Sequence, residues 1–283
     1  MTLHNYFNQF KKELEEIYSI SESENISDWV FENILGLKRG NRLLKKDDTI
    51  SPKNTDDLNA ALARLKEHEP VQYVLGESWF YKERFWLTHD VLIPRPETEE
   101  LVSWALSETS KDNPIDIIDI GTGSGCIPII LKKYLPNSII SSIDVSKNAI
   151  EVAKRNADKL NVAIEFICTD FITESNWANL GKFDIIISNP PYIPTGESQT
   201  LHKNVINYEP ALALFVDNST PLLFYEKIIK FSHLHLHKAG KIFVEVHEDY
   251  AIDTLKLFET YDFDKIEIKK DIYGKERMIM ATK

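Results

Sequence analysis

Apolar positions in the first quarter of the chain recur at steps of three and four, the spacing that one face of a helix requires. A first helix is predicted where this spacing runs through Leu3, Tyr6, Phe7, Phe10, Leu14, Ile17 and Tyr18. A second is expected over Asp28–Leu37, and a third from Asn54, whose side chain could cap it, until Pro70 stops it. Residues 1–75 are therefore predicted to form a small helical domain.

Two short segments rich in strand-favouring aromatic residues follow. They are Ser78–Tyr81 and Arg84–Thr88, separated by a short polar turn. Pro94 and Pro96 end the extended stretch, and the acids after them suit the first turn of a helix. The pattern predicts a β-hairpin linker over residues 76–95 and a larger domain over residues 96–283.

In the larger domain, apolar runs alternate with helical patterns from Gly125 and over Lys147–Leu160. The runs cover residues 115–120, 138–143, 163–168, 183–188 and 241–246. Such runs suit parallel strands that are covered on both faces, joined by helical crossovers. Two last strands, 265–269 and 277–281, are joined by too short a link for a crossover and should be antiparallel. The prediction is an α/β fold with a doubly wound, mostly parallel seven-stranded sheet and a terminal antiparallel strand.

Composition narrows the class of protein. Of the 283 residues, 43% are hydrophobic and 27% charged, the balance of a globular protein with a real core. The net charge of −11 repels phosphate, so no direct nucleic-acid contact is expected. Apolar runs stay below the roughly 20 residues that span a bilayer, and the start lacks a basic-then-apolar signal. We therefore expect a cytoplasmic protein with no membrane contact.

Two local features, the cysteines and a basic cluster, add further expectations. Cys126 and Cys168 lie far apart, without the spacing of a zinc site or a disulfide framework, so buried, reduced thiols and no metal site are expected. A basic cluster without acids is expected to be a solvated turn, with a partner-docking surface as the alternative. It consists of Lys38, Arg39, Arg42, Lys45 and Lys46.

A glycine-rich loop follows the first strand of the larger domain and opens a helix. It comprises Gly121, Thr122, Gly123, Ser124 and Gly125. Backbone can approach a ligand closely there, and helix amides can meet its polar end, so a nucleotide-like ligand is expected. Asp144 closes the next strand, where it can accept from ribose hydroxyls, and Asp170 with Phe171 follows the third, placed for an adenine ring. With Asp119 before it, the loop resembles the first motif of class I methyltransferases, which bind S-adenosylmethionine; Asp119 and the glycines would face its methionine part.

Asn189, Pro190, Pro191 and Tyr192 follow the fourth strand and form the predicted catalytic loop. The prolines remove backbone donors and fix the direction of the carbonyls. An amide nitrogen is a poor nucleophile because its lone pair is delocalised. If the Asn189 side-chain oxygen and the Pro190 carbonyl accept its two N–H groups, the nitrogen becomes more tetrahedral, and Tyr192 can stack on the amide plane. Because the donor is a sulfonium, in-line positioning should matter more than a strong base.

Further segments distinguish protein substrates from nucleic acids. From about residue 70 to the end, the chain resembles the HemK/PrmC family of peptide chain release factor glutamine N5-methyltransferases. The segments that carry this resemblance are Gln72–Gly76, Val91–Glu99, Asn189–Ile193, Glu209–Leu214 and Asp271–Arg277.

The resemblance implies that the substrate is the glutamine of the Gly-Gly-Gln motif in class 1 release factors, with the N-terminal helices docking the factor. The products are N5-methylglutamine and S-adenosylhomocysteine. By the same resemblance, Asn189 also touches the cofactor, and Arg95 and Glu97 shape the substrate entrance. The chain departs from the family at Lys82, where relatives often have Gly, and at 245–250, which lacks the usual Gly and Gln.

Three other interpretations remain open at this point. An adenine-N6 methyltransferase would bind DNA or RNA in a salt-dependent way. A non-catalytic release-factor-binding protein would bind the factor but ignore the cofactor. A nicotinamide dehydrogenase would bind NAD in place of S-adenosylmethionine.

Overall fold

The computed structural model of the chain describes residues 1–110 and 113–283. It separates into two compact units. The first contains Met1–Glu77 together with His202–Tyr208, and the second contains Ser78–Leu201 together with Glu209–Lys283. Within the first unit, the Tyr208 hydroxyl donates to the Glu67 carbonyl at 2.8 Å.

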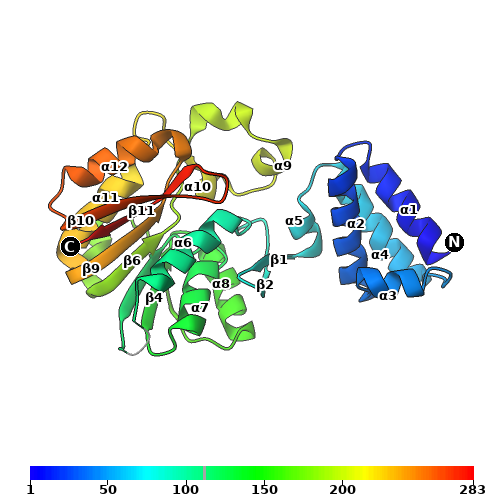
Figure 1. Ribbon diagram of the computed structural model, residues 1–283, viewed down its shortest axis with the longest axis horizontal. Coiled ribbons are helices and arrows are strands. Elements are labelled where there is room, and N and C mark those ends of the chain that lie inside the picture. The colour runs from blue at the N-terminus through cyan, green and yellow to red at the C-terminus, as the bar shows by residue number, and fades with distance from the viewer. Residues whose placement is uncertain (111–112) are drawn as a thin grey trace. The chain divides into compact units, whose positions relative to one another are not determined.

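The first unit is helical (Figure 1). Hydroxyl side chains cap three of its helices: Thr2, Ser19 and Ser51 accept from backbone N–H groups of the first turns. Asn54 is therefore not the cap that the sequence suggested, and the second helix begins earlier than predicted because Ser19 starts it. The helices are α1 Leu3–Leu14, α2 Ile20–Leu35, α3 Arg39–Leu44, α4 Pro52–Lys66, α5 Val71–Leu75 and α9 Lys203–Ile206.

The basic cluster at 38–46 is only partly solvated, which corrects the expectation of a solvated turn. Residues 39–44 form α3, and Arg42 is 6% exposed. Its guanidinium pairs with Asp28 at 2.5 Å and lies 3.5 Å from the centroid of the Phe7 ring. A guanidinium can be buried there because a carboxylate and an aromatic face replace its water.

The predicted hairpin is formed by β1 (Glu77–Phe80) and β2 (Glu83–Trp86). Its two turn residues, Tyr81 and Lys82, have φ of 53° and 68°. Positive φ at both positions is the pattern of a type I′ turn, and glycine adopts this conformation most readily. The departure at Lys82 therefore puts a side chain where the backbone prefers none.

The second unit is built on one seven-stranded sheet in the order β10-β11-β9-β6-β3-β4-β5. Neighbours from β9 to β5 are parallel, and β11 is antiparallel to both β9 and β10. This confirms the predicted mostly parallel sheet and its antiparallel last strand. The strands are β3 Asp116–Ile120, β4 Ile139–Asp144, β5 Glu165–Cys168, β6 Phe183–Ser188, β9 Leu236–Glu245, β10 Lys265–Lys270 and β11 Glu276–Thr282.

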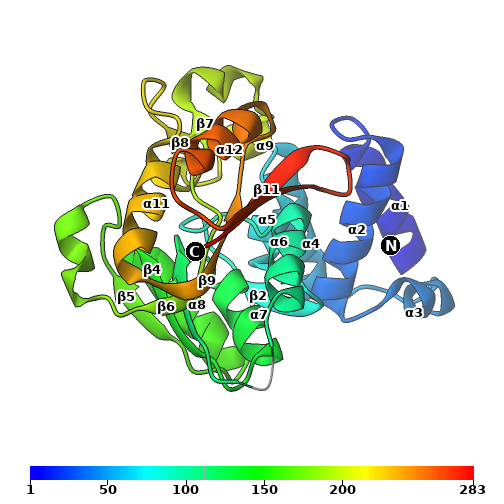
Figure 2. The ribbon, with the colours of Figure 1, turned by 60° about the vertical axis from the view of Figure 1, so that its left-hand side comes forward.

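Helices cover both faces of this sheet, as Figures 1 and 2 show. Successive apolar residues of one strand enter different cores: Ile117 packs against α6, α7 and α8, and Ile118 against α11 and α12. These helices are α6 Pro96–Ser107, α7 Cys126–Tyr134, α8 Lys147–Lys159, α11 Leu223–His235 and α12 Ala251–Glu259. The shorter elements are η1 Glu174–Asn179, β7 Ile193–Pro194, η2 Thr195–Thr200, α10 Ala211–Leu214, β8 Phe215–Val216 and η3 Glu248–Tyr250.

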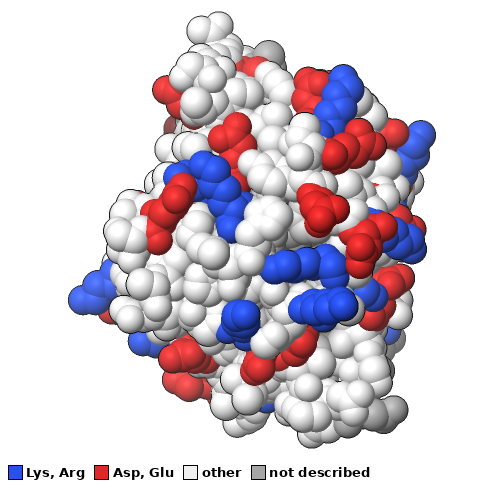
Figure 3. All heavy atoms as spheres, turned by 90° about the vertical axis from the view of Figure 1, so that its left-hand side faces the viewer, with Lys and Arg blue, Asp and Glu red and all other residues white. Residues whose placement is uncertain are grey.

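Burial and surface charge complete the picture. Cys126 is buried, but Cys168 is exposed at the end of the edge strand β5, contrary to the expectation for both thiols. On the face drawn in Figure 3, basic side chains are interspersed with acidic ones. Within the described part of the chain, every helix is too short or too polar to cross a membrane.

Candidate active site

A cavity of about 480 Å³ opens at the carboxyl ends of β3, β4 and β6. Parallel α/β sheets bind ligands at this edge because the strand-to-helix loops gather there. The predicted residues that line it are Arg95, Gly121, Thr122, Gly123, Ser124, Asp144, Asp170, Phe171, Asn189, Pro190 and Pro191. Four predicted residues are not among its lining: Glu97, Asp119, Gly125 and Tyr192.

The glycine loop is fixed by backbone contacts with β4. Gly121 and Thr122 donate their N–H groups to the Ile143 carbonyl, at 2.9 and 3.1 Å. Gly125 begins α7 at φ 81°, and a Cβ there would lie 3.0 Å from the Cβ of Ala153 on α8. Gly125 thus has a packing role, which explains why it does not line the cavity although the loop around it does.

Asp144 is oriented by two backbone donors. The Gly123 N–H donates to one carboxylate oxygen at 2.9 Å, and the Ser146 N–H to the other at 2.8 Å. Burial raises its pKa, and these donors oppose the rise because they stabilise the ionised form. The carboxylate therefore faces the cavity in one fixed orientation.

Asp119 lies beneath the loop rather than in the cavity, which corrects the expectation that it faces the ligand directly. Its side chain is fully buried, and one oxygen accepts from the Ser142 hydroxyl at 2.6 Å. Burial raises its pKa to about 7, opposed by hydrogen bonds from Ser142 and Thr122. Its second oxygen has no hydrogen-bond partner within the described residues.

The charged residues on the cavity wall are mainly acidic. Asp90, Asp144 and Asp170 line it, whereas Arg95 is its arginine and is already paired. Asp170 accepts from the Ile172 N–H at 3.0 Å and the Thr173 hydroxyl at 2.7 Å. Such a wall favours a ligand with positive charge over a pyrophosphate.

Phe171 belongs both to the cavity and to the core. It lines the cavity, yet it is only 5% exposed and packs against Trp177 and Phe231, with ring centroids 5.4 and 5.5 Å away. The core contacts fix the ring, so that it offers a rigid apolar surface to a planar group.

Arg95 lies at the cavity and pairs with Glu209 rather than Glu97. The Arg95 Nη2 donates to the Glu209 Oε1 at 2.5 Å, and the Ile93 N–H donates to the other oxygen at 3.3 Å. Glu97 lies in the first turn of α6. The sequence did not single out Glu209 as a site residue, although it stands in one of the segments that carry the family resemblance.

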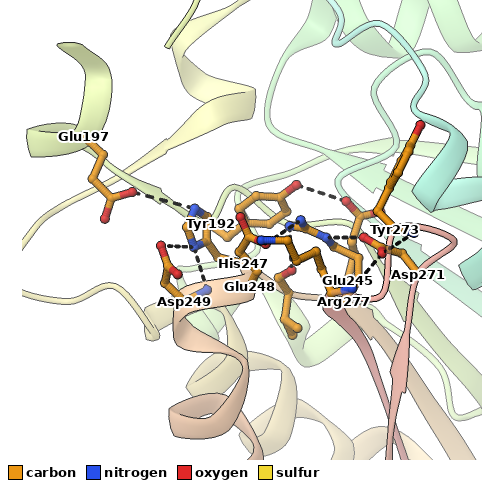
Figure 4. Close-up of polar contacts among 11 residues, drawn as sticks. Tyr192, Glu197, Glu245, His247, Glu248, Asp249, Asp271, Tyr273 and Arg277 are labelled. Atoms are coloured by element: carbon orange, nitrogen blue, oxygen red, sulfur yellow. Dashed lines mark hydrogen bonds and ion pairs between the residues drawn. The ribbon is translucent and has the colours of Figure 1, made fainter. Parts of the chain in front are cut away.

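The catalytic loop is held by a buried carboxylate that sequence reasoning missed. Asn189 donates through Nδ2 to the Thr98 hydroxyl at 3.0 Å, and Thr98 donates to Glu245 at 2.7 Å. Tyr192 donates its hydroxyl to the other Glu245 oxygen at 3.0 Å (Figure 4). Glu245 could have been found from the sequence, because it is an acid at the end of an apolar strand, β9, which lies beside β6, the strand that precedes Asn189.

A second polar group lies beside Tyr192 (Figure 4). The His247 ring nitrogens are 3.7 Å from Glu197 and 3.9 Å from Asp249, and its ring lies edge-on to Tyr192. The ligand atoms of these three side chains fall within 4.8 Å of one another, close enough for one metal ion. Nδ1 accepts from the Asp249 N–H at 3.2 Å, so in the neutral ring the proton is on Nε2, which then donates and does not bind a metal ion.

The doubly wound sheet with its glycine loop and acidic cavity defines a class I methyltransferase fold. Residues 101–212 match the family model described as the methyltransferase small domain, and residues 5–76 match the PrmC N-terminal domain. Two solved structures support the fold alone: the METTL16 MTase domain (TM-score 0.52, 16% identity, 82% and 96% of the two chains) and a human methyltransferase 10 domain containing protein (0.50, 16%, 82% and 97%).

Full-length relatives narrow this class to one family. The chain is 40% identical to the release factor glutamine methyltransferase of Flavobacterium psychrophilum, covering 100% of this chain and 99% of the relative. It is 34% identical to that of Bacteroides thetaiotaomicron, covering 96% and 97%. The chain belongs to the release factor glutamine methyltransferase family.

Proposed function

We propose that this protein transfers a methyl group from S-adenosylmethionine to the side-chain amide nitrogen of a glutamine in class 1 peptide chain release factors. The glutamine is that of the Gly-Gly-Gln motif, and the products are N5-methylglutamine and S-adenosylhomocysteine. Family membership over the whole chain supports the reaction. The docking role of residues 1–75 and the cytoplasmic location remain predictions.

The cavity fits S-adenosylmethionine by its charge and shape. When bound, this cofactor supplies an electrophilic methyl group on a positively charged sulfur. Asp144, fixed by Gly123 and Ser146, is placed to accept from hydroxyl groups, and Phe171 offers a flat apolar surface. Asp119 below the loop adds negative potential when ionised, and its partner Ser142 also contacts the Thr122 hydroxyl of the loop. The same acidic wall disfavours the pyrophosphate of a nicotinamide dinucleotide.

The observation that carries the proposal is the orientation of the Asn189 amide. Since its Nδ2 donates to Thr98, its carbonyl oxygen is the group left to face the cavity that Asn189 lines. That oxygen, with the Pro190 carbonyl beside it, can accept the two N–H groups of a glutamine amide. With both N–H groups held, the amide nitrogen points toward the methyl group of S-adenosylmethionine. Fixing the reacting atoms in this orientation lowers the barrier to methyl transfer.

Methyl transfer to a purified release factor tests the proposal. The protein is incubated with methyl-labelled S-adenosylmethionine and either the normal factor or one whose Gly-Gly-Gln glutamine is changed to alanine, and labelled peptides are mapped by mass. We expect label on that glutamine alone. Label on nucleic acid, or on neither factor, would contradict the proposal, and binding of the factor without any transfer would indicate a non-catalytic binding protein.

A further inference from the structure

The catalytic asparagine lies at one end of a short hydrogen-bonded chain that ends at a carboxylate. Asn189 Nδ2 donates to Thr98 Oγ1 at 3.0 Å, and Thr98 Oγ1 donates to Glu245 Oε2 at 2.7 Å. Thr98 and Glu245 are 3% and 1% exposed. Water is thus excluded from this hydrogen-bonded chain, so the polar groups of its three side chains must form hydrogen bonds with one another.

The hydrogen bond from Thr98 to Glu245 fixes the donor and acceptor roles of the other groups. The Thr98 hydroxyl has one proton, and that proton is donated to Glu245 Oε2. The Thr98 oxygen can then only accept, so Asn189 has to turn its NH₂ group toward it. The amide oxygen of Asn189 is the group that remains for the cavity.

The same carboxylate also fixes the far end of the loop. Tyr192 donates its hydroxyl to Glu245 Oε1 at 3.0 Å (Figure 4). Asn189 is bound through Thr98 to Oε2 of the same carboxylate. The sheet explains this convergence: β9 ends at Glu245 parallel to β6, with Ser188 paired to Val244, and Asn189 follows Ser188 directly. One side chain therefore spans the loop from its first residue to its fourth.

A buried carboxylate such as Glu245 is energetically unfavourable if its role is only structural. Burying a carboxylate is strongly unfavourable, and an apolar side chain at the end of β9 would avoid this loss of hydration. Burial raises the pKa of Glu245, and the hydrogen bonds from Thr98 and Tyr192 and the charge of Arg277 oppose the rise. Arg277 itself contacts Asp271 at 3.4 Å and Glu248 at 3.9 Å. Hydrogen bonds from Thr98 and Tyr192 replace the water that the carboxylate loses, so the chain and the carboxylate depend on each other.

We propose that Glu245 is a positioning residue, which through Thr98 sets the Asn189 amide with its oxygen toward the substrate and through Tyr192 fixes the other end of the loop. This inference rests on the proposed function, because it assigns Asn189 the task of accepting from the substrate amide. Glu245 is not among the residues that line the cavity, and it acts through its two hydrogen-bond partners.

Isosteric substitutions separate this role from a merely structural one. Glu245→Gln keeps the size but offers one acceptor in place of two, and Thr98→Val keeps the shape of Thr98 but breaks the chain. The matched control is Tyr225→Phe, because the buried Tyr225 hydroxyl donates to the backbone carbonyl of Glu245, at 3.0 Å, and not to its carboxylate. Thr98→Ser, which keeps a hydroxyl, is the conservative rescue.

We expect Glu245→Gln and Thr98→Val each to lower kcat by about 30-fold or more, since an aligned acceptor is lost. Binding of S-adenosylmethionine, measured by calorimetry, should change less than about threefold. Thr98→Ser should recover most of the turnover, and Tyr225→Phe should lower the unfolding temperature with kcat within about threefold of the unchanged protein. Equal kcat in Glu245→Gln, Thr98→Val and Tyr225→Phe would overturn the inference.

Neutron diffraction on the deuterated full-length protein locates the deuterium atoms of the Asn189–Thr98–Glu245 hydrogen bonds without any measurement of turnover. Deuterium on the Asn189 nitrogen facing Thr98, and its loss from that direction in Glu245→Leu, which removes both acceptors, is the expected result. An unchanged amide in Glu245→Leu would contradict the positioning role. If the release factor is not methylated but the amide follows Glu245 as expected, the proposed function fails while the control of Asn189 by Glu245 stands.

Discussion

Arg95 and Glu209 are 114 positions apart in sequence and form a close ion pair at the cavity, with 2.5 Å between Nη2 and Oε1. The Glu209 side chain is 1% exposed and that of Arg95 33% exposed. The pair connects the segment before α6 to the segment before α10, which are two of the stretches that carry the family resemblance. Its charge is therefore balanced within the protein rather than by a ligand.

We expect Arg95→Met to destabilise the protein by about 2–4 kcal/mol, because it leaves a buried carboxylate without its cation. Adding Glu209→Gln to Arg95→Met should restore part of that loss, since the uncompensated charge is removed. Urea unfolding of both variants measures the two values. A double variant that is less stable than Arg95→Met would show that the pair is not coupled in this way.

Asn189→Ala should lower turnover at least about 100-fold, because the substrate amide loses an aligned acceptor. Binding of S-adenosylmethionine should weaken much less than turnover. Labelled methyl transfer and calorimetry measure the two effects. Asn179→Ala is the control, since Asn179 is an exposed asparagine at the end of η1 that does not line the cavity. Near-normal turnover in Asn189→Ala would refute the mechanism.

Asp144→Asn should raise the dissociation constant for S-adenosylmethionine by about 10- to 100-fold, since hydrogen bonds to a charged acceptor contribute about 1.5–3 kcal/mol. Calorimetry on the purified variant measures the change. Asp158→Asn, on the exposed side of α8, provides the matched control and should bind normally. Equal affinities in the two variants would remove Asp144 from the cofactor site.

The pKa of Asp119, raised by burial to about 7 from an ordinary 3.8, predicts a pH-dependent stability. Below about pH 4 the Asp119 carboxyl group is neutral in the folded and unfolded states, so it does not change the free energy of unfolding. Between pH 4 and pH 7 the unfolded chain releases the proton while the folded protein retains it, so stability falls as pH rises. The expected loss from this group is about 4 kcal/mol by pH 8.

Asp119→Asn removes this titration and should flatten the loss between pH 4 and pH 8. Urea unfolding at both pH values, on the unchanged protein and the variant, gives the difference. Asp144 is present in both proteins and its charge raises the pKa of Asp119, so the difference reports Asp119 together with its coupling to Asp144. Parallel curves for the two proteins would show that Asp119 does not titrate in this range.

Lys82→Gly should stabilise the protein by about 0.5–1 kcal/mol, because φ of 68° strains any residue with a Cβ. Lys82→Ala is the matched control: it removes the same side chain but keeps the Cβ, so no gain is expected. Thermal unfolding of both variants tests this. A gain in Lys82→Ala equal to that in Lys82→Gly would assign the effect to the lysine side chain instead.

Local sequence patterns were sufficient to predict the sheet and the location of the cavity. Apolar runs alternating with helical spacing specify a parallel sheet covered on both faces, and the short link before β11 allows only an antiparallel last strand. The glycine loop and the segment Asn189–Tyr192 follow strands, and the carboxyl ends of parallel strands meet at one edge. The location of the cavity could therefore be predicted from the chain alone.

Only the tertiary structure decided how deeply the acidic site residues are buried and which side chains they pair with. Asp119 and Asp144 both belong to strand ends, but burial takes Asp119 beneath the loop and leaves Asp144 at the cavity. Glu209 and Glu245 reach their partners across 114 and 147 residues of sequence. No local spacing encodes such contacts, because they depend on which strands become neighbours and on how closely the loops between them pack.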